Sequence, residues 1–487
     1  MRNISSRLFL FFICLYTYFF STTFLSAQTT FATNQVVKTN SRDSSKTAMA
    51  SVDTLNKKDT LTQKKMVVAL DSLQKADSLA VKKEKPIKYI DTIYYENIFS
   101  IKFNPINNPI GMPIIELGNG ALNFSFDDLD GDIKDFVYTV EHCNADWTPS
   151  ELEQQEYLDA FDLERVRRYQ AGFNTLVPFM HYDFSLPNEN FKIKKSGNYL
   201  LKIYEDLGDK RLVMTRRFVI YEQKTGVIRP KYTFSEASTF RTNQEFDLSV
   251  GIKNLRSVNP IKEIKMKMIQ NGRWDQSITV PPLMTIGDSL LFDYQNVITF
   301  KAGKEFRLAD FRSNRFRSER VAKITRGDET WEYRMLPDRD RFNEPYFSYR
   351  DADGSYIIEN SHEDDDNLQS DYIIAQFSLP MNEPLDSADA YIVGPFSDWQ
   401  LRRDYKMEFR ESANEVRGYH ADIYLKQGFY NYLYAVKYKN KPEPDFTSLE
   451  GNWFETDNQY TVLLYQRPFG GRYDQVVGYL SFHCNGR

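Results

Sequence analysis

The sequence is poor in cysteine and histidine, which number three and five among 487 residues. Three cysteines exclude a disulfide-dense scaffold. A net charge of −5 argues against a dedicated nucleic-acid-binding protein, because such a domain is strongly basic. The chain also has no G-x-S-x-G elbow, H-E-x-x-H pair, phosphate loop or G-x-G-x-x-G turn. We therefore expect no catalytic residue, cofactor, metal or small-molecule substrate.

Aromatic residues, by contrast, are abundant, with 36 Phe, 31 Tyr and 5 Trp. A hydrophobic fraction of 41 % excludes collagen-like and wholly disordered classes. At roughly 100–200 residues per domain, the length predicts about three folded units.

Residues 1–27 are predicted to be a signal peptide. Arg2 and Arg7 precede an apolar run over residues 8–20, and Ala27 ends a small-residue cleavage site. The run is shorter than the about 20 apolar residues of a membrane span. An uncleaved N-terminal anchor is the alternative. No later segment reaches spanning length, so we expect an exported protein without direct membrane insertion.

Residues 28–88 are predicted to be a disordered, low-complexity tail. From residue 32 to 88 there is no aromatic residue and no glycine, and twelve basic residues face six acidic ones. Such a segment cannot bury enough apolar surface to offset the entropy of ordering. Four Asp-Thr-Leu or Asp-Ser-Leu repeats within it read either as low complexity or as a short motif for a partner. The remaining residues, 89–487, are clearly acidic, with a net charge of −13.

From residue 89 onward, short alternating strands are separated by turn signals. Phe99, Ile101 and Phe103 alternate with polar residues, and the Tyr-rich run 430–438 has the same period of two. Strands this short and regularly punctuated predict an all-β fold of three tandem immunoglobulin-like antiparallel β-sandwich domains after the disordered tail. Lapses in the strand pattern place these domains at 89–224, 225–340 and 341–487. The stretch 150–169 is predicted to be an insertion with one or two helical turns.

Two local features could serve as binding sites for a cation or a metal. Residues 127–132 gather four carboxylates, but Ile133 and Thr139 stand where a calcium-binding EF-hand requires Gly and Glu. A hairpin turn capped by Asp side chains explains the run without an ion. Cys143 and Cys484 each lie in a His-Cys-Asn tripeptide. An exported protein could pair them, but two separately buried thiols are the favoured interpretation.

The segment 301–326 is a basic stretch of the folded region, with nine basic and three acidic residues interleaved with Phe. An exported protein is not expected to encounter nucleic acid, so we do not expect this stretch to bind it. A solvated strand edge is one interpretation. The other is a partner interface, because Arg is enriched at protein interfaces. Its candidate residues are Arg307, Arg312, Arg315, Arg317 and Arg320.

The run Tyr391-Ile392-Val393-Gly394-Pro395-Phe396-Ser397-Asp398-Trp399, followed by Gly418-Tyr419-His420-Ala421-Asp422, resembles the early-set immunoglobulin-like modules that bind glycogen. The resemblance implies such a fold for the third domain. It also makes Trp399 a candidate sugar contact, although aromatic residues more often serve packing.

A longer likeness covers residues 95–480. Phe126-Asp127-Asp128-Leu129-Asp130-Gly131-Asp132, Val140-Glu141-His142-Cys143-Asn144-Ala145-Asp146-Trp147-Thr148-Pro149-Ser150 and Thr215-Arg216-Arg217-Phe218 resemble the type IX secretion system plug family, as do Val393-Gly394-Pro395-Phe396 and the segment 450–474. The chain departs from the family pattern at Ala160, where Gly often follows Tyr-Leu-Asp. The tail lies outside the likeness.

The resemblance implies a non-enzymatic plug in the periplasm, on the inner side of the outer membrane. Its implied partner is the large outer-membrane translocon barrel, whose periplasmic mouth it would gate. The alternative is a periplasmic or surface carbohydrate-binding β-sandwich protein.

Overall fold

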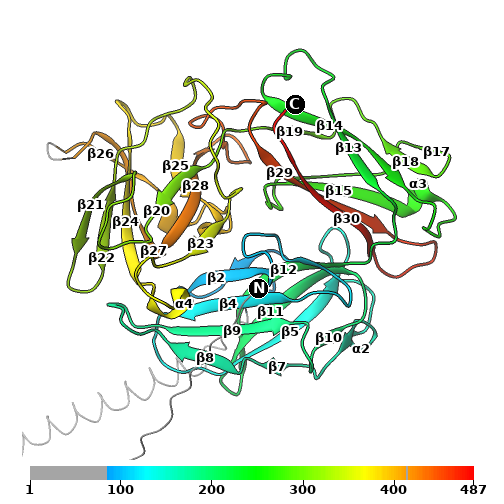
Figure 1. The fold of residues 1–487 in the computed structure, drawn as a ribbon, viewed down its shortest axis with the longest axis horizontal. Helices are drawn as coiled ribbons and strands as arrows, with labels where there is room; N and C mark the ends of the chain where they lie inside the picture. The colour runs from blue at the N-terminus through cyan, green and yellow to red at the C-terminus, as the bar shows by residue number, and fades with distance from the viewer. Residues whose placement is uncertain (1–84, 413–414, 487) are drawn as a thin grey trace, which may run out of the picture. The chain divides into compact units, whose positions relative to one another are not determined.

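The computed structural model describes residues 85–412 and 415–486, drawn in colour in Figure 1. Residues 84–487 form one compact unit. Nearly all its regular structure is β, so the prediction of an all-β fold is confirmed. The predicted signal peptide and all but the last four residues of the predicted tail lie outside the described residues. Within the described residues, no helix has both the length and the apolar character needed to cross a membrane.

The first sandwich is built from two facing sheets. The larger one holds six strands: β1 (Thr92–Ile93), β12 (Lys210–Tyr221), β11 (Gly197–Asp206), β5 (Phe136–Cys143), β7 (Glu164–Arg165) and β3 (Ile114–Glu116), the last parallel to β12. The facing sheet holds β2 (Ile98–Pro105), β4 (Leu122–Asp128), β9 (Met180–Leu186) and β8 (Arg168–Ala171). A small pair, β6 (Leu158–Asp159) with β10 (Lys192–Ile193), follows the single helical turn α2 (Gln154–Tyr157), in line with the predicted insertion.

Alternating aromatic residues fill the core of this sandwich. Tyr138 of β5 stacks on Phe184 of β9 with ring centroids 4.1 Å apart, and Phe103 of β2 meets Phe218 of β12 at 5.5 Å. Each pair joins one sheet to the other. Because successive side chains of a strand point to opposite faces of the sheet, one face of each strand lies in the core.

The second sandwich is discontinuous in sequence. One sheet contains β13 (Ile228–Thr233), β14 (Asn243–Gly251), β18 (Ser289–Phe292), β17 (Met284–Ile286) and β19 (Thr299–Lys301). The other contains β16 (Ser277–Val280), β15 (Ile264–Gln270), β29 (Asn458–Gln466) and β30 (Gln475–Cys484), with helical turn α3 (Pro260–Glu263) leading into β15. β15 pairs with β29 over seven residues, so the C-terminal strands complete a sheet whose strand β15 begins 194 positions before β29, at Ile264 against Asn458.

The third sandwich is inserted between β19 and β29. One sheet holds β20 (Arg307–Asp310), β28 (Gly428–Tyr438), β23 (Tyr356–Ile358) and β25 (Ala388–Val393). The other holds β21 (Val321–Arg326), β22 (Trp331–Met335), β24 (Tyr372–Pro380), β27 (Gly418–Lys426) and β26 (Glu408–Arg410). Short helical turns, α4 (Asp366–Gln369), η1 (Pro395–Ser397) and η2 (Arg403–Tyr405), lie in its loops.

The chain enters and leaves the third sandwich at one point. The carbonyl of Gly303 accepts hydrogen bonds from the backbone N–H of Trp453 at 2.8 Å and from the hydroxyl of Thr456 at 2.9 Å. This return of the chain to Gly303 differs from the prediction that the second domain ends at residue 340 and the third begins at residue 341. Residues 305–340 belong with the third sandwich, and residues after 456 belong with the second. The immunoglobulin-like topology of the individual sandwiches stays a prediction.

The first sandwich contacts the second through apolar side chains. Leu200 and Val219 of the first pack with Ile269, Leu463 and Tyr465 of the second. Contacts between the first and third sandwiches combine buried ion pairs with aromatic packing, in which the rings of Phe99 and Tyr424 lie 5.6 Å apart by centroid.

Candidate functional site

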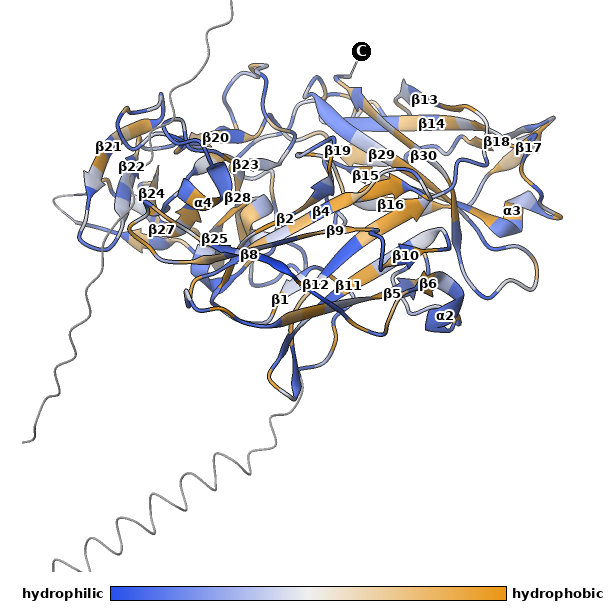
Figure 2. Ribbon diagram, turned by 60° about the horizontal axis from the view of Figure 1, so that its bottom comes forward, coloured by the Kyte–Doolittle hydropathy of each residue, from blue (hydrophilic) through white to orange (hydrophobic). Residues whose placement is uncertain are grey.

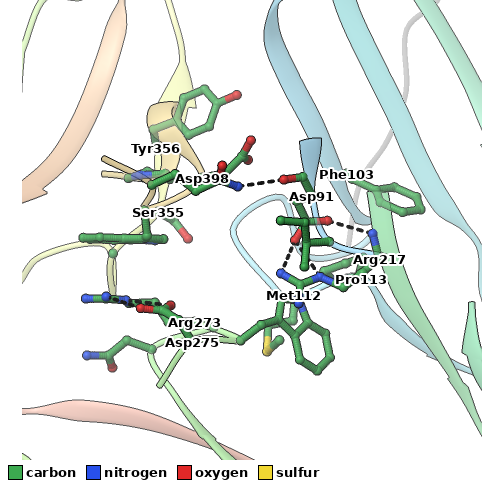
Figure 3. A pocket seen from close by; sticks show the side chains of 18 of the residues that line it. Asp91, Phe103, Met112, Pro113, Arg217, Arg273, Asp275, Ser355, Tyr356 and Asp398 are labelled. Atoms are coloured by element: carbon green, nitrogen blue, oxygen red, sulfur yellow. Dashed lines mark hydrogen bonds and ion pairs between the residues drawn. The ribbon is translucent and has the colours of Figure 1, made fainter. Parts of the chain in front are cut away.

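A pocket lies where the three sandwiches meet. Its volume is about 650 Å³, within the range of ligand pockets. We call it the junction pocket (Figure 3). Its charged lining comes from all three sandwiches: Asp91, Lys102, Arg216 and Arg217 from the first, Arg273 and Asp275 from the second, and Asp353, Asp398, Lys437 and Glu443 from the third.

Asp91 and Arg217 form a two-pronged ion pair on the wall of the first sandwich. One carboxylate oxygen of Asp91 accepts from Nε and Nη2 of Arg217 at 3.0 and 2.7 Å, and the other accepts the backbone N–H of Arg217 at 2.7 Å. Burial opposes ionisation of Asp91, but the guanidinium groups of Arg217 and Arg216 outweigh it and hold its pKa below the usual range. The amide of Gln400 donates to the carbonyl of Asp91 at 2.7 Å and so ties this wall to the third sandwich.

A second ion pair crosses directly from the first sandwich to the third. Nη1 of Arg216 donates to a carboxylate oxygen of Asp398 at 3.0 Å, and the Arg216 side chain is only 6 % exposed. Asp398 ends the turn η1 in a left-handed conformation with φ of 52°. Burial raises the pKa of Asp398, although Arg216 favours its ionised form. This contact is a charge-assisted hydrogen bond, which is stronger than a hydrogen bond between neutral groups.

Arginine also links the second sandwich to its neighbours by stacking on aromatic rings. The guanidinium of Arg273 lies 4.6 Å from the ring centroid of Trp399 and 4.0 Å from that of Phe446, both in the third sandwich. Arg217 approaches the ring of Trp274 in the second sandwich at 5.3 Å. Cation–π contacts therefore join all three sandwiches around the pocket.

Lys102, like Lys437, is a lining cation without an acidic partner among the described residues. No carboxylate oxygen of the described residues lies within 4.0 Å of its ammonium, which donates to the carbonyl of Tyr356 and lies 4.0 Å from the centroid of that ring. Burial lowers the pKa of Lys102 to about 8. Arg216, Arg217 and Arg273 each form an ion pair with a carboxylate. Most of the charged side chains of the junction pocket therefore stabilise its walls.

A second, fully buried joint connects the first and third sandwiches. The carboxylate of Asp127, at the end of β4, accepts from Lys426 Nζ at 2.6 Å, from Tyr372 Oη at 2.7 Å and from His181 Nδ1 at 2.6 Å. Lys426 also lies 4.0 Å from the ring centroid of Phe179. Burial opposes the ionisation of Asp127, yet Lys426 and His181 outweigh it and lower its pKa.

The remaining acids of the run 127–132 hold a lysine. The ammonium of Lys134 lies 2.7 Å from Asp128 and 3.5 Å from Asp132, and it also contacts Asp130. These three carboxylates are close enough together to bind a metal ion. An ammonium group thus stands at the centre of the cluster that the sequence marked as a possible cation site.

The five arginines proposed from the sequence do not form one surface. Arg307 is 6 % exposed and is paired inside the third sandwich with Glu450 at 2.9 Å and Asp338 at 3.0 Å. Arg320 also binds Asp338, at 2.9 Å. Of the other three, Arg312 is paired with Asp310 and Glu359, whereas Arg315 and Arg317 are exposed. In the described structure Arg307 therefore has no free surface to offer a partner.

Trp399 lies in the junction pocket and is half-buried. Arg273 stacks on its ring, and Phe306 lies 5.4 Å away by ring centroid. A Cβ atom on Gly354 would come within 3.0 Å of the Trp399 ring, so the backbone approaches closely there. The ring's position is that of a packing residue between sandwiches.

Cys143 and Cys484 are free thiols, both buried. Cys143 lies between the first and second sandwiches, whereas Cys484 ends β30. The favoured interpretation as two separate thiols is confirmed.

Sequence reasoning named Asp127 as part of a possible cation site and Trp399 as a candidate sugar contact, but it assigned no residue to a joint between sandwiches. One signal was available, since successive residues of a strand point to opposite faces. Two adjacent arginines, Arg216 and Arg217, and two adjacent acids, Asp127 and Asp128, therefore cannot all face the same solvent. In each pair, one side chain must face an interior or a neighbouring sandwich. The residue that it contacts could not be predicted from the sequence.

The fold and its two joints define an all-β protein of three sandwiches fixed to one another by apolar packing, ion pairs and arginine stacking. Residues 98–222, which make up most of the first sandwich, match the family model described as type 9 secretion system plug protein 1st domain. The match agrees with the family that the sequence motifs predicted, and it relates the chain to type IX secretion.

Among solved structures, a hypothetical protein from Parabacteroides merdae is 27 % identical and superposes with a TM-score of 0.76, covering 82 % of this chain and 100 % of its own. A biofilm-associated protein domain and a collagen adhesin from S. aureus give TM-scores of 0.15 and 0.10 at 9 % and 8 % identity, covering 82 % and 80 % of this chain and 61 % and 92 % of theirs. These two values are too low to carry an argument. No curated protein matches the chain.

Proposed function

We propose that this chain is a non-enzymatic plug that seals the periplasmic end of the type IX secretion translocon pore. The observation that carries the proposal is the match of residues 98–222 to the plug family's first domain. Its partner would be the large outer-membrane barrel, and its location the periplasmic side of that membrane. The predicted signal peptide supports export.

The joints between the sandwiches give the proposal physical support. A stopper in a wide aqueous pore has to keep its shape, since loose domains would leave gaps. Here Asp127 and Lys426 join the first and third sandwiches, Arg216 and Asp398 join them again, and Arg273 stacks the second on the third. Buried charges of this kind favour one relative orientation over others.

Co-purification from detergent-solubilised envelopes tests the proposal. A tagged copy should bring down a very large outer-membrane barrel protein, and deletion of the gene should let large antibiotics cross the outer membrane. Unchanged exclusion of those antibiotics, together with no barrel in the pull-down, would contradict it.

The same pull-down tests whether the exposed arginines of the basic stretch 301–326 contact the barrel. Arg315→Glu with Arg317→Glu reverses two exposed charges without touching the buried pairs of Arg307. Loss of the barrel from this variant would place the docking surface there. The matched control is Lys439→Glu with Lys441→Glu, on an exposed hairpin of the same sandwich.

The carbohydrate alternative gains no support from the position of Trp399, whose ring is stacked by Arg273. Retention on a polysaccharide gel that is lost in a folded Trp399→Ala variant would nevertheless favour it over the plug.

A further inference from the structure

The free end of the second sandwich exposes several bulky apolar side chains. Phe469 is 93 % exposed and Val258 is 90 % exposed. Four more apolar residues of the same end are exposed by 42–60 %: Ile261, Leu283, Met284 and Ile286. We call these six residues the apolar tip.

The members of the apolar tip lie close together although they come from three segments. Turn α3, which contains Ile261, packs beside the edge strand β17, as Figures 1 and 2 also show. The turn between β29 and β30, which carries Phe469, is joined to α3 by a 2.8 Å hydrogen bond from the N–H of Arg467 to the carbonyl of Glu263. Phe469 and Lys262 line one hollow, together with Asp146 and Asp474.

The fold does not require apolar side chains at the two most exposed positions. In the turn after β29, the N–H of Gly471 donates to the carbonyl of Pro468 at 2.7 Å, and Gly470 supplies the positive φ of 75°. Phe469 only occupies the apex. Val258 precedes Asn259, whose side chain caps α3, and takes no part in the cap itself. A polar residue would serve either turn equally well.

The segment that carries Val258 and Ile261 also carries cations that have no acidic partner among the described residues. Between residues 252 and 267 there are five basic residues and one acid, on a folded region whose net charge is negative. Lys253, Arg256 and Lys262 are exposed, and no carboxylate oxygen of the described residues lies within 4.0 Å of their charged groups. The single acid, Glu263, is 8 % exposed and accepts hydrogen bonds from the hydroxyl of Ser257 and the N–H of Asn259.

We propose that this end of the second sandwich binds the surface of an anionic phospholipid membrane. Phe469 and Val258 enter the boundary between headgroups and acyl chains, and the surrounding cations contact lipid phosphates. Protruding apolar apices with unpaired cations around them are typical of interfacial lipid binding, which combines apolar burial with attraction to anionic headgroups.

The proposal rests on the proposed function only for the identity of the membrane, the outer membrane beside the barrel. It departs from the expectation, drawn from the sequence, that the protein makes no direct membrane insertion. The contact is peripheral, and it would orient the second sandwich against the lipid next to the pore.

Vesicle flotation tests the lipid contact without any barrel. The chain of residues 84–487 is used, because it is the compact unit and lacks the basic tail and the apolar run of residues 8–20, either of which could bind lipid. It should float with vesicles of equal parts phosphatidylcholine and phosphatidylglycerol, and far less with phosphatidylcholine alone.

Two pairs of substitutions separate the apolar and the charged contributions. Phe469→Ser with Val258→Ser should abolish flotation. Lys253→Glu with Lys262→Glu should weaken it by at least about 25-fold, since each cation near an anionic surface contributes about fivefold. The controls, Phe347→Ser at a site 77 % exposed elsewhere and Lys439→Glu with Lys441→Glu, should float as the parent does.

Absence of flotation, or flotation that Phe469→Ser with Val258→Ser leaves unchanged, would overturn the proposal. A dimer in solution that dissociates in the Phe469→Ser with Val258→Ser variant would also overturn it, because the apolar tip would then be a contact between two copies of the chain. Loss of the barrel from the pull-down with that pair, when the parent does not float, would assign the tip to a protein. Because the vesicles contain no protein, the lipid contact can fail while the plug proposal stands.

Discussion

Lys426 Nζ lies 2.6 Å from a carboxylate oxygen of Asp127, although 299 positions separate the two residues in the chain. Both side chains are 1 % exposed. The pair joins the last residue of β27 to β4, and therefore the third sandwich to the first. Tyr372 and His181 complete the hydrogen bonds of the carboxylate, so the charge is buried but fully engaged.

Removing the lysine should destabilise the protein strongly, because it leaves a buried carboxylate unpaired. We expect Lys426→Met to lower the free energy of unfolding by about 3–5 kcal/mol. The double variant Asp127→Asn with Lys426→Met should recover part of the loss, since no uncompensated charge remains. Urea denaturation followed by tryptophan fluorescence measures both.

The matched control is Lys406→Met, which breaks a 2.9 Å pair with Asp389 whose partners are 42 % and 41 % exposed. It should cost less than about 1 kcal/mol. Equal losses at the two lysines would show that the buried pair has no special role in joining the sandwiches.

Asp127 also predicts acid sensitivity. Its pKa in the folded protein is lowered, so its contribution to stability is fully present above its unfolded pKa of about 3.9 and is lost as pH falls through the lower folded value. Stability measured between pH 6 and pH 3 should fall less steeply in Asp127→Asn than in the parent. Parallel curves would contradict the assignment.

Glu305 predicts the opposite dependence. It is 2 % exposed, and its carboxylate accepts from the hydroxyl of Tyr346 and, at 3.4 Å, from the N–H of Asp457. Burial raises the pKa of Glu305 to about 7. The folded state thus favours the protonated acid, and stability declines as pH rises from about 4.5 to about 7.

We therefore expect Glu305→Gln to stabilise the protein at pH 8, by roughly 1–2 kcal/mol, and to leave it nearly unchanged at pH 4. The amide oxygen of glutamine can still accept from Tyr346 and Asp457. Thermal unfolding at the two pH values tests this, with the exposed Glu189→Gln as control. A loss of stability at pH 8 would show that the charged form is the one the fold needs.

Strand type and the identity of the first domain could be predicted because they depend on local signals. Alternation in runs such as 430–438 fixes which residues face a core, and motifs such as Thr215-Arg216-Arg217-Phe218 are contiguous. The return of β29 to β15 could not be predicted, because any alternating strand fits any open sheet edge equally well. The same limit applies to Asp127 and Lys426, whose meeting depends on how finished sandwiches pack.

The two thiols should be unreactive in the folded protein. Cys143 is completely buried, and burial raises its pKa to about 12, so almost no thiolate forms at pH 8. In the chain of residues 84–487, iodoacetamide should label neither cysteine until urea is added, and both thereafter. Labelling that appears only after reduction would reveal a disulfide and contradict the structure.

The discontinuous second sandwich predicts how the chain can be divided. A chain ending at residue 340 lacks β29 and β30, and with them Tyr460, Val462 and Leu464 of the core. We expect its second sandwich to be unfolded, as shown by rapid proteolysis after residue 225. The loss of the β15–β29 pairing also leaves the backbone of β15 with an open edge.

Excision of the inserted sandwich should succeed where that truncation fails. Replacing residues 304–455 by a short Gly-Ser linker joins Gly303 to Thr456, whose hydroxyl already donates to the Gly303 carbonyl at 2.9 Å. The excised chain should unfold cooperatively in urea, because the first and second sandwiches keep their shared apolar interface around Leu463 and Val219. Asp127 then faces water and needs no partner. If the chain ending at 340 proves cooperative and the excised chain does not, the second sandwich is continuous in sequence and the pairing of β15 with β29 is wrong.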